Sequence, residues 1–188
     1  MIVDKINKYW FNEGHFNSDQ RDYFIETLEK LKPDNILEIG FASGRSCVTS
    51  LVAGQPNKMI SIDIDLDYIG ARNHASLMET EFPNLSIVEG NSNEVLNTDF
   101  FEKNFKSGVD FAFIDGCHNY ECAKKDCENV YPNLNEGGVM VVDDYKSGGP
   151  NGCTIVEVDN AVNDFAKENN LLFETWNVNG KGFAIFNK

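Results

Sequence analysis

Three carboxylates stand directly after two strand-length apolar segments. Asp115 follows Val109–Ile114, and Asp143 and Asp144 follow Val139–Val142. Because the carboxyl ends of neighbouring parallel strands converge on one crevice, we expect these side chains to cluster. Clustered carboxylates repel one another, which raises their pKa values or calls for a cation. Oxygen ligands suit a hard, octahedral ion, so the sequence predicts an Mg²⁺ site at these acids.

A histidine lies close to this acidic set. His118 comes three residues after Asp115, at the expected start of the next helix. An imidazole with a pKa near neutral can accept a proton from a hydroxyl, so His118 is a candidate general base. The alternative is a structural histidine that caps the helix or bonds a strand-end carbonyl. His15 and His74 lack ligand spacing, and Cys117 lacks an activating partner, so no chemistry is assigned to them.

A glycine-containing turn follows the first apolar segment. Ile36–Ile39 runs into GFASG (residues 40–44), and a helix is expected from about Arg45. Glycines let the backbone approach a ligand closely, and the helix N-terminus presents free N–H groups. The dinucleotide fingerprint G-x-G-x-x-G is not met, because Ala42 stands at its second glycine. By itself the turn indicates only that some ligand approaches the backbone.

Two acids make this turn more specific. Glu38 precedes Gly40 by two residues, which gives E-x-G-x-x-x-G up to Gly44, and Asp63 ends the second strand-like run. An acid in that place can accept hydrogen bonds from both hydroxyls of a ribose, which favours an adenosine-containing ligand. The alternative for Asp63 is an acid that caps a helix or a turn.

The segments that position these residues alternate between the apolar pattern of buried strands and that of amphipathic helices. Nearly continuous apolar runs, as in parallel strands buried on both faces, occur at Ile36–Ile39, Met59–Ile64, Leu85–Val88, Val109–Ile114 and Val139–Val142. Helical stripes occur at Phe24, Leu28 and Leu31, at Tyr120, Ala123, Cys127, Val130 and Leu134, and at Ile155, Val158, Val162 and Phe165. This alternation predicts an α/β fold with a Rossmann-like, doubly wound sheet.

The chain ends depart from this alternation. Leu171–Val178 and Gly182–Phe186 are strand-like and are joined through Asn179-Gly180, a strong hairpin dipeptide, so we expect a C-terminal antiparallel hairpin. Residues 1–17 have no clear period and fit either a lid over the active site or a helix packed on the sheet. We expect one domain over residues 1–188, with a helical or lid segment at 1–30 and a core at 36–188.

Composition limits the classes of partner. A formal net charge of −14 repels phosphate backbones and anionic lipid, so neither nucleic acid nor membrane is expected as a partner. The charge suits a divalent metal or a sulfonium, although solubility alone could explain it. Five cysteines without a C-x-x-C pair indicate reduced thiols in a cytoplasmic protein. The start of the chain does not look like a secretory signal.

Four segments in succession resemble the motifs of class I S-adenosylmethionine-dependent methyltransferases. They are NILEIGFASGRSCVTSL, MISIDID, LSIVEGNSNEVL and VDFAFIDGCHNYECAKKDCENVYPNLNEGGVMVVDDY. Within that superfamily they are most similar to small O-methyltransferase families of the metal-dependent type with an I-D-G-x-H-x-Y segment. The resemblance extends from about Ile36 to Tyr145, with the motifs in order at the expected strand ends.

The resemblance implies that Ile36–Val52 holds S-adenosylmethionine. The cofactor-binding residues that it implies are Glu38, Gly40 and Gly44 around the methionine portion, Asp63 at the ribose, Asn91 and Ser92 near the adenine, and Asp115. Ala42 departs from the family, since many members have glycine there. We expect its methyl group to narrow the loop without blocking the cofactor.

The resemblance also implies a reaction. Metal-dependent members chelate a metal through an acid after the fourth strand and an acidic pair after the fifth, and Asp115, Asp143 and Asp144 fall on these positions. His118 stands where catechol-type relatives have a lysine base. The implied function is methylation of a hydroxyl on a small molecule, such as a sugar, polyol or phenol, with Mg²⁺ lowering the pKa of that hydroxyl. The displacement itself needs mainly proximity and alignment.

Several alternatives stay open. In a metal-independent enzyme His118 would act as the base, Asp115 would orient the cofactor or substrate, and Asp143 and Asp144 would cap the loop Tyr145–Cys153. A second alternative is a non-catalytic, cofactor-binding partner subunit, and a nicotinamide-dependent dehydrogenase ranks last. The loop after Tyr145 is expected to border the substrate site, with Tyr145 and Lys146 as candidate contacts. The acceptor and any homo-oligomer are left open.

Overall fold

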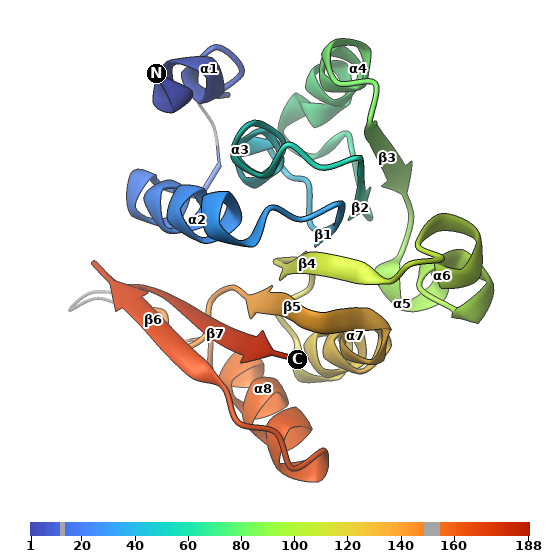
Figure 1. The fold of residues 1–188 in the computed structure, drawn as a ribbon. Helices are drawn as coiled ribbons and strands as arrows, with labels where there is room; N and C mark the ends of the chain where they lie inside the picture. Colours follow the sequence, from blue (N-terminus) through green and yellow to red (C-terminus); the bar gives the residue numbers. More distant parts are fainter. Residues whose placement is uncertain (12–13, 149–154) are drawn as a thin grey trace. The chain divides into compact units, whose positions relative to one another are not determined.

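Strands alternate with helices along the chain as the apolar pattern predicts (Figure 1). The computed structural model describes residues 1–11, 14–148 and 155–188. These residues form two compact units, Met1–Asn91 and Ser92–Lys188. No helix within the described ranges is both long and apolar enough to cross a bilayer.

The first unit contains a parallel three-stranded arrangement. Its elements are α1 (Ile2–Asn7), α2 (Ser18–Leu31), β1 (Asn35–Ile39), α3 (Arg45–Gly54), β2 (Lys58–Asp63), η1 (Tyr68–Gly70), α4 (Ala71–Glu81) and β3 (Leu85–Glu89). β2 pairs in parallel with β1 on one side and with β3 on the other. Ile36, Leu37, Met59 and Ile60 are buried, as expected for strands covered on both faces.

The ends of α2 show how the sequence defines its length. Asn17 and Gln20 form a capping box at its start, with Asn17 Oδ1 accepting from the backbone N–H of Asp19 and Gln20. The helix ends at Lys32, which adopts the left-handed region. Phe24 and Leu28 are fully buried, and α2 packs on α3, so these two residues of the predicted apolar stripe are confirmed, whereas Leu31 is only partly buried.

The second unit combines parallel and antiparallel pairing. Its elements are α5 (Ser92–Val95), α6 (Thr98–Asn104), β4 (Val109–Ile114), α7 (Tyr120–Val130), η2 (Tyr131–Asn133), β5 (Leu134–Val142), α8 (Val156–Glu168), β6 (Glu174–Val178) and β7 (Lys181–Asn187). β4 and β5 are parallel, β7 is antiparallel to β5, and β6 is antiparallel to β7. α7 and α8 pack against each other.

The C-terminal hairpin is confirmed. Val178 pairs with Lys181, which leaves the two-residue turn Asn179-Gly180. Both turn residues have positive φ, 52° and 79°, as a type I′ turn requires. Mostly parallel strands followed by this hairpin confirm the predicted α/β fold class.

Several boundaries differ from the sequence prediction. The strand expected from Leu171 begins only at Glu174, as β6. Leu134 was expected to end a helical stripe, but α7 ends at Val130 because Pro132 stands in the next turn, and Leu134 begins β5. β5 also starts before the apolar run at Val139. Gly137 and Gly138 of β5 interrupt the apolar pattern there. The pairing of β5 with β4 shifts its register at this point, between Val109 and Phe111 of β4.

Candidate active site

The GFASG turn of the first unit requires unusual backbone angles. Gly40, Ala42 and Gly44 have φ values of 95°, 43° and 75°. A side chain at Gly44 would also collide with Phe41, because a Cβ there would lie 2.8 Å from the ring. The position at which this chain departs from the family, Ala42, is therefore one where the backbone favours glycine.

Glu38 supports this turn from within the protein. Its side chain is fully buried, and its two carboxylate oxygens accept hydrogen bonds from Ser46 Oγ at 2.6 Å and Ser61 Oγ at 2.5 Å. These bonds join β1 to the first turn of α3 and to β2. Burial and the neighbouring Glu38 raise the pKa of the Cys47 thiol well above its usual range. Glu38 thus fixes the start of α3, and its contact with a methionine moiety stays a prediction.

Asp63 joins the end of β2 to the same turn. Its Oδ2 accepts from the backbone N–H of Ala42 at 2.8 Å, and its Oδ1 accepts from the N–H of Asp65 at 2.9 Å. The bond from the Asp65 N–H caps the turn after β2, which is the alternative role expected for Asp63 from the sequence beside ribose binding. Each carboxylate oxygen can accept more than one hydrogen bond, so both bonds are compatible with a further donor.

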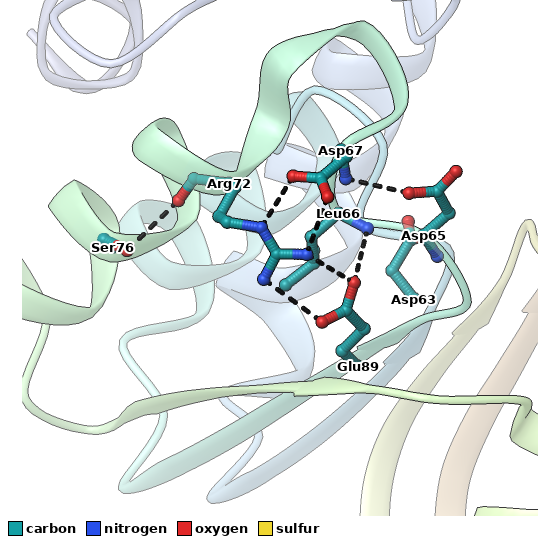
Figure 2. A network of polar contacts seen from close by, with 7 residues as sticks. All are labelled: Asp63, Asp65, Leu66, Asp67, Arg72, Ser76 and Glu89. Carbon is teal, nitrogen blue, oxygen red and sulfur yellow. Dashed lines mark hydrogen bonds and ion pairs between the residues drawn. The ribbon is translucent and has the colours of Figure 1, made fainter.

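A residue that the sequence did not single out connects the neighbouring segments. Arg72 of α4 lies between Asp67 and Glu89, as Figure 2 shows. Glu89 ends β3 directly before Gly90, whose N–H donates to the Asp63 carbonyl at 2.7 Å. The segments predicted to bind ribose and adenine are therefore tied together.

The predicted adenine contacts have other partners or lie at the unit boundary. Asn91 ends the first unit, and Ser92 begins α5 of the second. Burial raises the pKa of Asp126 to about 6, and hydrogen bonds from Ser92 and Asn93 partly oppose this rise. Asn93 Nδ2 donates to Asp126 Oδ1 at 2.7 Å. The hydroxyl of Ser92 thus forms a hydrogen bond with the buried Asp126. An adenine contact by Ser92 or Asn91 stays a prediction.

The N-terminal segment packs on the glycine turn. Arg45, the first residue of α3, donates to the carbonyls of Phe11 at 2.7 Å, Gly14 at 2.8 Å and Phe16 at 3.2 Å. Gly14 approaches Ser43 so closely that a side chain there would collide with its hydroxyl. Residues 10–11 and 14–16 therefore lie near Ser43 of the predicted cofactor loop and Arg45 at the start of α3, beyond the short helix α1.

His74, to which no chemistry was assigned, helps to hold this segment. Its Nδ1 lies 2.9 Å from the carbonyl oxygen of Ser43, and its ring stacks on Phe11 with centroids 5.2 Å apart. The side chain is buried. These contacts give His74 a structural role within the first unit.

An imidazole and two carboxylates gather in the second unit. His118 Nε2 lies 3.5 Å from Asp115 Oδ1 and 3.3 Å from Asp144 Oδ2, and the ligand atoms of the three residues lie within 4.8 Å of one another. Lys181 of β7 approaches Asp144 Oδ1 at 3.9 Å. We call Asp115, His118 and Asp144 the acid–histidine cluster.

The pKa values within the cluster follow from burial and charge. Loss of hydration raises the pKa of Asp115, and Asp144 adds to this rise, whereas His118 opposes it. A hydrogen bond with Asp115 raises the pKa of His118 above its ordinary value, against the effect of partial burial. The site therefore favours a positively charged group beside its carboxylates.

Asp143 lies outside this cluster. Its side chain is 5% exposed, and its Oδ1 accepts from the backbone N–H of Asp144 at 2.7 Å. Burial raises its pKa well above the ordinary value, and the charges of Asp115 and Asp144 add to the effect. The structure thus gathers two of the three predicted metal ligands with His118, and Asp143 is not in that group.

The segment after β5 is fixed by two different elements. Asp144 and Lys146 have φ values of 60° and 52°, a strained region that few side chains adopt. The Lys146 N–H donates to Asp159 of α8 at 2.6 Å, and Ser147 Oγ accepts from the Gly182 N–H of β7 at 3.1 Å. Asp144 is therefore held from both sides.

Tyr145, a candidate substrate contact, is buried instead. Its ring packs edge-on against Phe173, and its hydroxyl donates to Asn163 Oδ1 at 3.0 Å. The residue anchors the segment, whereas Lys146 beside it is exposed. The rest of the predicted loop up to Cys153, residues 149–154, lies outside the described residues.

Comparison with solved structures shows a shared fold. Solved structures of methyltransferases share this fold over the whole chain. The S-adenosylhomocysteine-bound methyltransferase PaMTH1 of Podospora anserina has a TM-score of 0.76 at 16% identity, covering 100% of this chain and 87% of that one. The O-methyltransferase TomG of Streptomyces achromogenes, in complex with S-adenosylmethionine, has a TM-score of 0.72 at 14% identity, covering 100% and 88%.

The family follows from the sequence itself. A family model described as "Methyltransferase domain" matches residues 37–145, more than half of the chain. The chain therefore belongs to this family of methyltransferase domains, which confirms the resemblance to methyltransferases. No curated protein matches the chain in sequence.

Proposed function

We propose that this enzyme transfers the methyl group of S-adenosylmethionine to a hydroxyl oxygen of a small molecule, with a divalent cation at the acid–histidine cluster. The observation that carries the proposal is the convergence of Asp115, His118 and Asp144 within 4.8 Å. Similar solved structures from Streptomyces achromogenes and Bacillus cereus are described as O-methyltransferases, which supports oxygen as the acceptor atom.

The first unit supplies the cofactor side of the proposal. Its glycine turn brings backbone N–H groups to the start of α3, where the free carboxylate of a methionine moiety would find donors. Asp63 can accept from the ribose hydroxyls in addition to its two backbone donors. Ile64 beside it is 71% exposed, and this apolar surface suits the face of an adenine.

The cluster fits a divalent cation in its donor set and its spacing. Two carboxylates and one imidazole lie close enough to share one ion after small side-chain movements. Burial and the charge of Asp144 raise the pKa of Asp115, and a bound cation would offset the repulsion between these two acids. Because imidazole also suits Mn²⁺, Fe²⁺ and Zn²⁺, this set is broader than the oxygen-only Mg²⁺ site predicted from sequence. When bound, such an ion would lower the pKa of a coordinated hydroxyl.

The protein's own residues can carry the proton transfer. Where Nε2 of His118 is not bound to an ion, the acceptor hydroxyl gives its proton to this atom while its oxygen forms a bond to the methyl carbon. The bond between that carbon and sulfur breaks, and its electron pair stays on sulfur, which leaves neutral S-adenosylhomocysteine. Asp115 and Asp144 stabilise the imidazolium that results.

A metal-independent enzyme is the second candidate, and one contact favours it. Lys181 Nζ lies 3.9 Å from Asp144, so a cation of the protein already faces this carboxylate. Lys181 would offset part of the negative charge of the two acids without a metal. In this case His118, in its neutral form, acts as the base and the cluster needs no ion.

Calorimetric titration with S-adenosylmethionine, followed by a labelled-methyl screen of sugars, polyols and phenols, tests the function. We expect binding by the wild type and transfer that EDTA abolishes and Mg²⁺ or Mn²⁺ restores. Asp144→Ala should lose transfer, whereas the matched control Glu102→Ala, an exposed acid of α6, should keep it. Transfer that survives both EDTA and Asp144→Ala supports the metal-independent enzyme. Failure to bind S-adenosylmethionine at millimolar concentration overturns both.

A further inference from the structure

Arg72 binds two carboxylates with one guanidinium group, one from the segment after β2 and one from the end of β3. Its Nε and Nη2 donate to Asp67 at 2.6 and 3.2 Å, and its Nη1 and Nη2 donate to Glu89 at 3.1 and 2.7 Å (Figure 2). Asp67 belongs to the segment after β2, and Glu89 is the last residue of β3. Such paired hydrogen bonds fix direction as well as distance.

From Asp67, hydrogen bonds lead back to the glycine turn. The Asp67 N–H donates to Asp65 Oδ1 at 2.9 Å, and the Asp65 N–H donates to Asp63 Oδ1 at 2.9 Å. Asp63 in turn accepts from the N–H of Ala42. Arg72 therefore stands at the far end of a series of contacts that reaches the proposed ribose acid.

A second series leads through Glu89. Its Oε1 also accepts from the N–H of Leu66 at 3.3 Å, so this carboxylate clamps the segment after β2 between two donors. The next residue, Gly90, donates to the carbonyl of Asp63. The guanidinium is thus joined to both sides of the segment that carries Asp63 and Ile64.

Charge explains why one cation matters here. Asp63, Asp65, Asp67 and Glu89 place four carboxyl groups in this short region. Hydrogen bonds to Arg72 lower the pKa of Asp67 and of Glu89, so both carboxylates are charged at neutral pH. Without Arg72 these charges would repel one another, and the segment could relax into other shapes.

We propose that Arg72 is a positioning residue for cofactor affinity, holding the segment Asp63–Asp67 and the end of β3 in the geometry that receives adenosine. The inference rests on the proposed function and deepens it, since it assigns a role at the same cofactor site. Arg72 touches neither the sulfonium nor the acceptor in this scheme. It therefore controls how tightly the adenosine half is bound and leaves the methyl transfer step alone.

The charge of the ligand separates positioning from simple electrostatics. S-adenosylmethionine carries a sulfonium charge that S-adenosylhomocysteine lacks. Removal of a nearby cation would by electrostatics alone favour S-adenosylmethionine and leave S-adenosylhomocysteine unchanged. Loss of positioning would weaken both ligands, and also 5′-methylthioadenosine, which lacks the amino-acid part.

The test compares Arg72→Ala, Arg72→Lys and the control Lys30→Ala by calorimetric titration with these three ligands. Lys30 pairs with Glu26 on exposed α2 of the same unit, so it matches Arg72 as a surface cation. We expect Arg72→Ala to raise the dissociation constants of all three ligands by about tenfold. Arg72→Lys keeps the charge but loses the paired geometry, so it should fall between, and Lys30→Ala should equal the wild type.

Each result has a definite meaning. Unchanged dissociation constants in Arg72→Ala, or tighter S-adenosylmethionine with unchanged S-adenosylhomocysteine, overturn the inference. If circular dichroism shows that Arg72→Ala does not fold, Glu89→Gln and Arg72→Lys decide, and wild-type affinity in both overturns it. Failure of the wild type to bind any of the three ligands instead overturns the proposed function, which keeps the two failures distinct.

Discussion

The Nε2 atom of His118 lies 3.3 Å from Oδ2 of Asp144, although the two residues follow different strands, β4 and β5. The same nitrogen lies 3.5 Å from Asp115. An imidazole between two carboxylates can accept a proton and keep it, and it can also join them in binding an ion. The first predictions separate these two roles.

Substitution of His118 by alanine should lower the rate of methyl transfer by about 10²- to 10⁴-fold, the usual contribution of a general base. S-adenosylmethionine should bind to this variant as to the wild type. Asp115 raises the pKa of His118 above its ordinary value of 6.5, and a base must be unprotonated to act. Wild-type activity should therefore decline as the pH is lowered through a value above 6.5. A pH–rate profile measures this limb, and His15→Ala, a change at an exposed histidine, is the control. Wild-type turnover in His118→Ala would exclude the base role.

Asp144→Asn should weaken binding of Mn²⁺ at least tenfold, because a charged ligand becomes neutral while its size is kept. Titration of the bound ion by electron paramagnetic resonance measures the affinity directly, without an acceptor. Glu102→Gln should bind Mn²⁺ as the wild type does. Equal Mn²⁺ affinity in Asp144→Asn would show that the acid–histidine cluster is not the metal site.

Ala42→Gly should stabilise the protein by about 0.5–1 kcal/mol, because the left-handed backbone at this position strains alanine and not glycine. The greater freedom of glycine in the unfolded chain offsets part of the gain. Urea unfolding gives the difference, with Ala53→Gly inside α3 as a control that should destabilise. A loss of stability in Ala42→Gly would contradict the claim that the backbone at Ala42 is strained.

Asp126→Asn should raise stability at pH 8 and leave it nearly unchanged near pH 4. Burial raises the folded-state pKa of Asp126 to about 6, against an unfolded value near 3.8. The wild type has its full free energy of unfolding below about pH 4, where the Asp126 carboxyl is protonated in both states. This free energy decreases as the pH rises through 6, because the buried carboxyl must then either stay protonated or become charged. Asparagine stays neutral, so the variant does not show this decrease. The gain at pH 8 is on the order of 3 kcal/mol at most. Urea unfolding at several pH values measures this gain. A gain that does not change with pH would show that the pKa of Asp126 is not raised in the folded protein.

The fold could be predicted from the sequence because its signals are local. Continuous apolar runs marked the strands, and Asn179-Gly180 marked the hairpin, since only a few turns bring two strands together through two residues. The boundary at Leu134 was missed because an apolar residue fits a helical stripe and a buried strand equally well.

The candidate site could be predicted only in part. Strand ends located Asp115, Asp143 and Asp144, but nothing in sequence shows which of two adjacent acids faces a cluster. The left-handed backbone at Asp144 and the hydrogen bond that Asp143 Oδ1 accepts from the Asp144 N–H distinguish the two acids in the structure. Arg72 gave no signal, because its partners Asp67 and Glu89 come from separate segments that meet only in the folded unit.

The hairpin β6–β7 has a consequence for the order of folding. Gly148 donates to the carbonyl of Gly180, and Lys181 approaches Asp144, so the segment carrying this carboxylate is held by residues more than thirty positions later in the sequence. Contacts of such long range form late, after local helices and turns. Catalytic competence should therefore be among the last properties that a refolding chain acquires, well after most of its helical signal has returned.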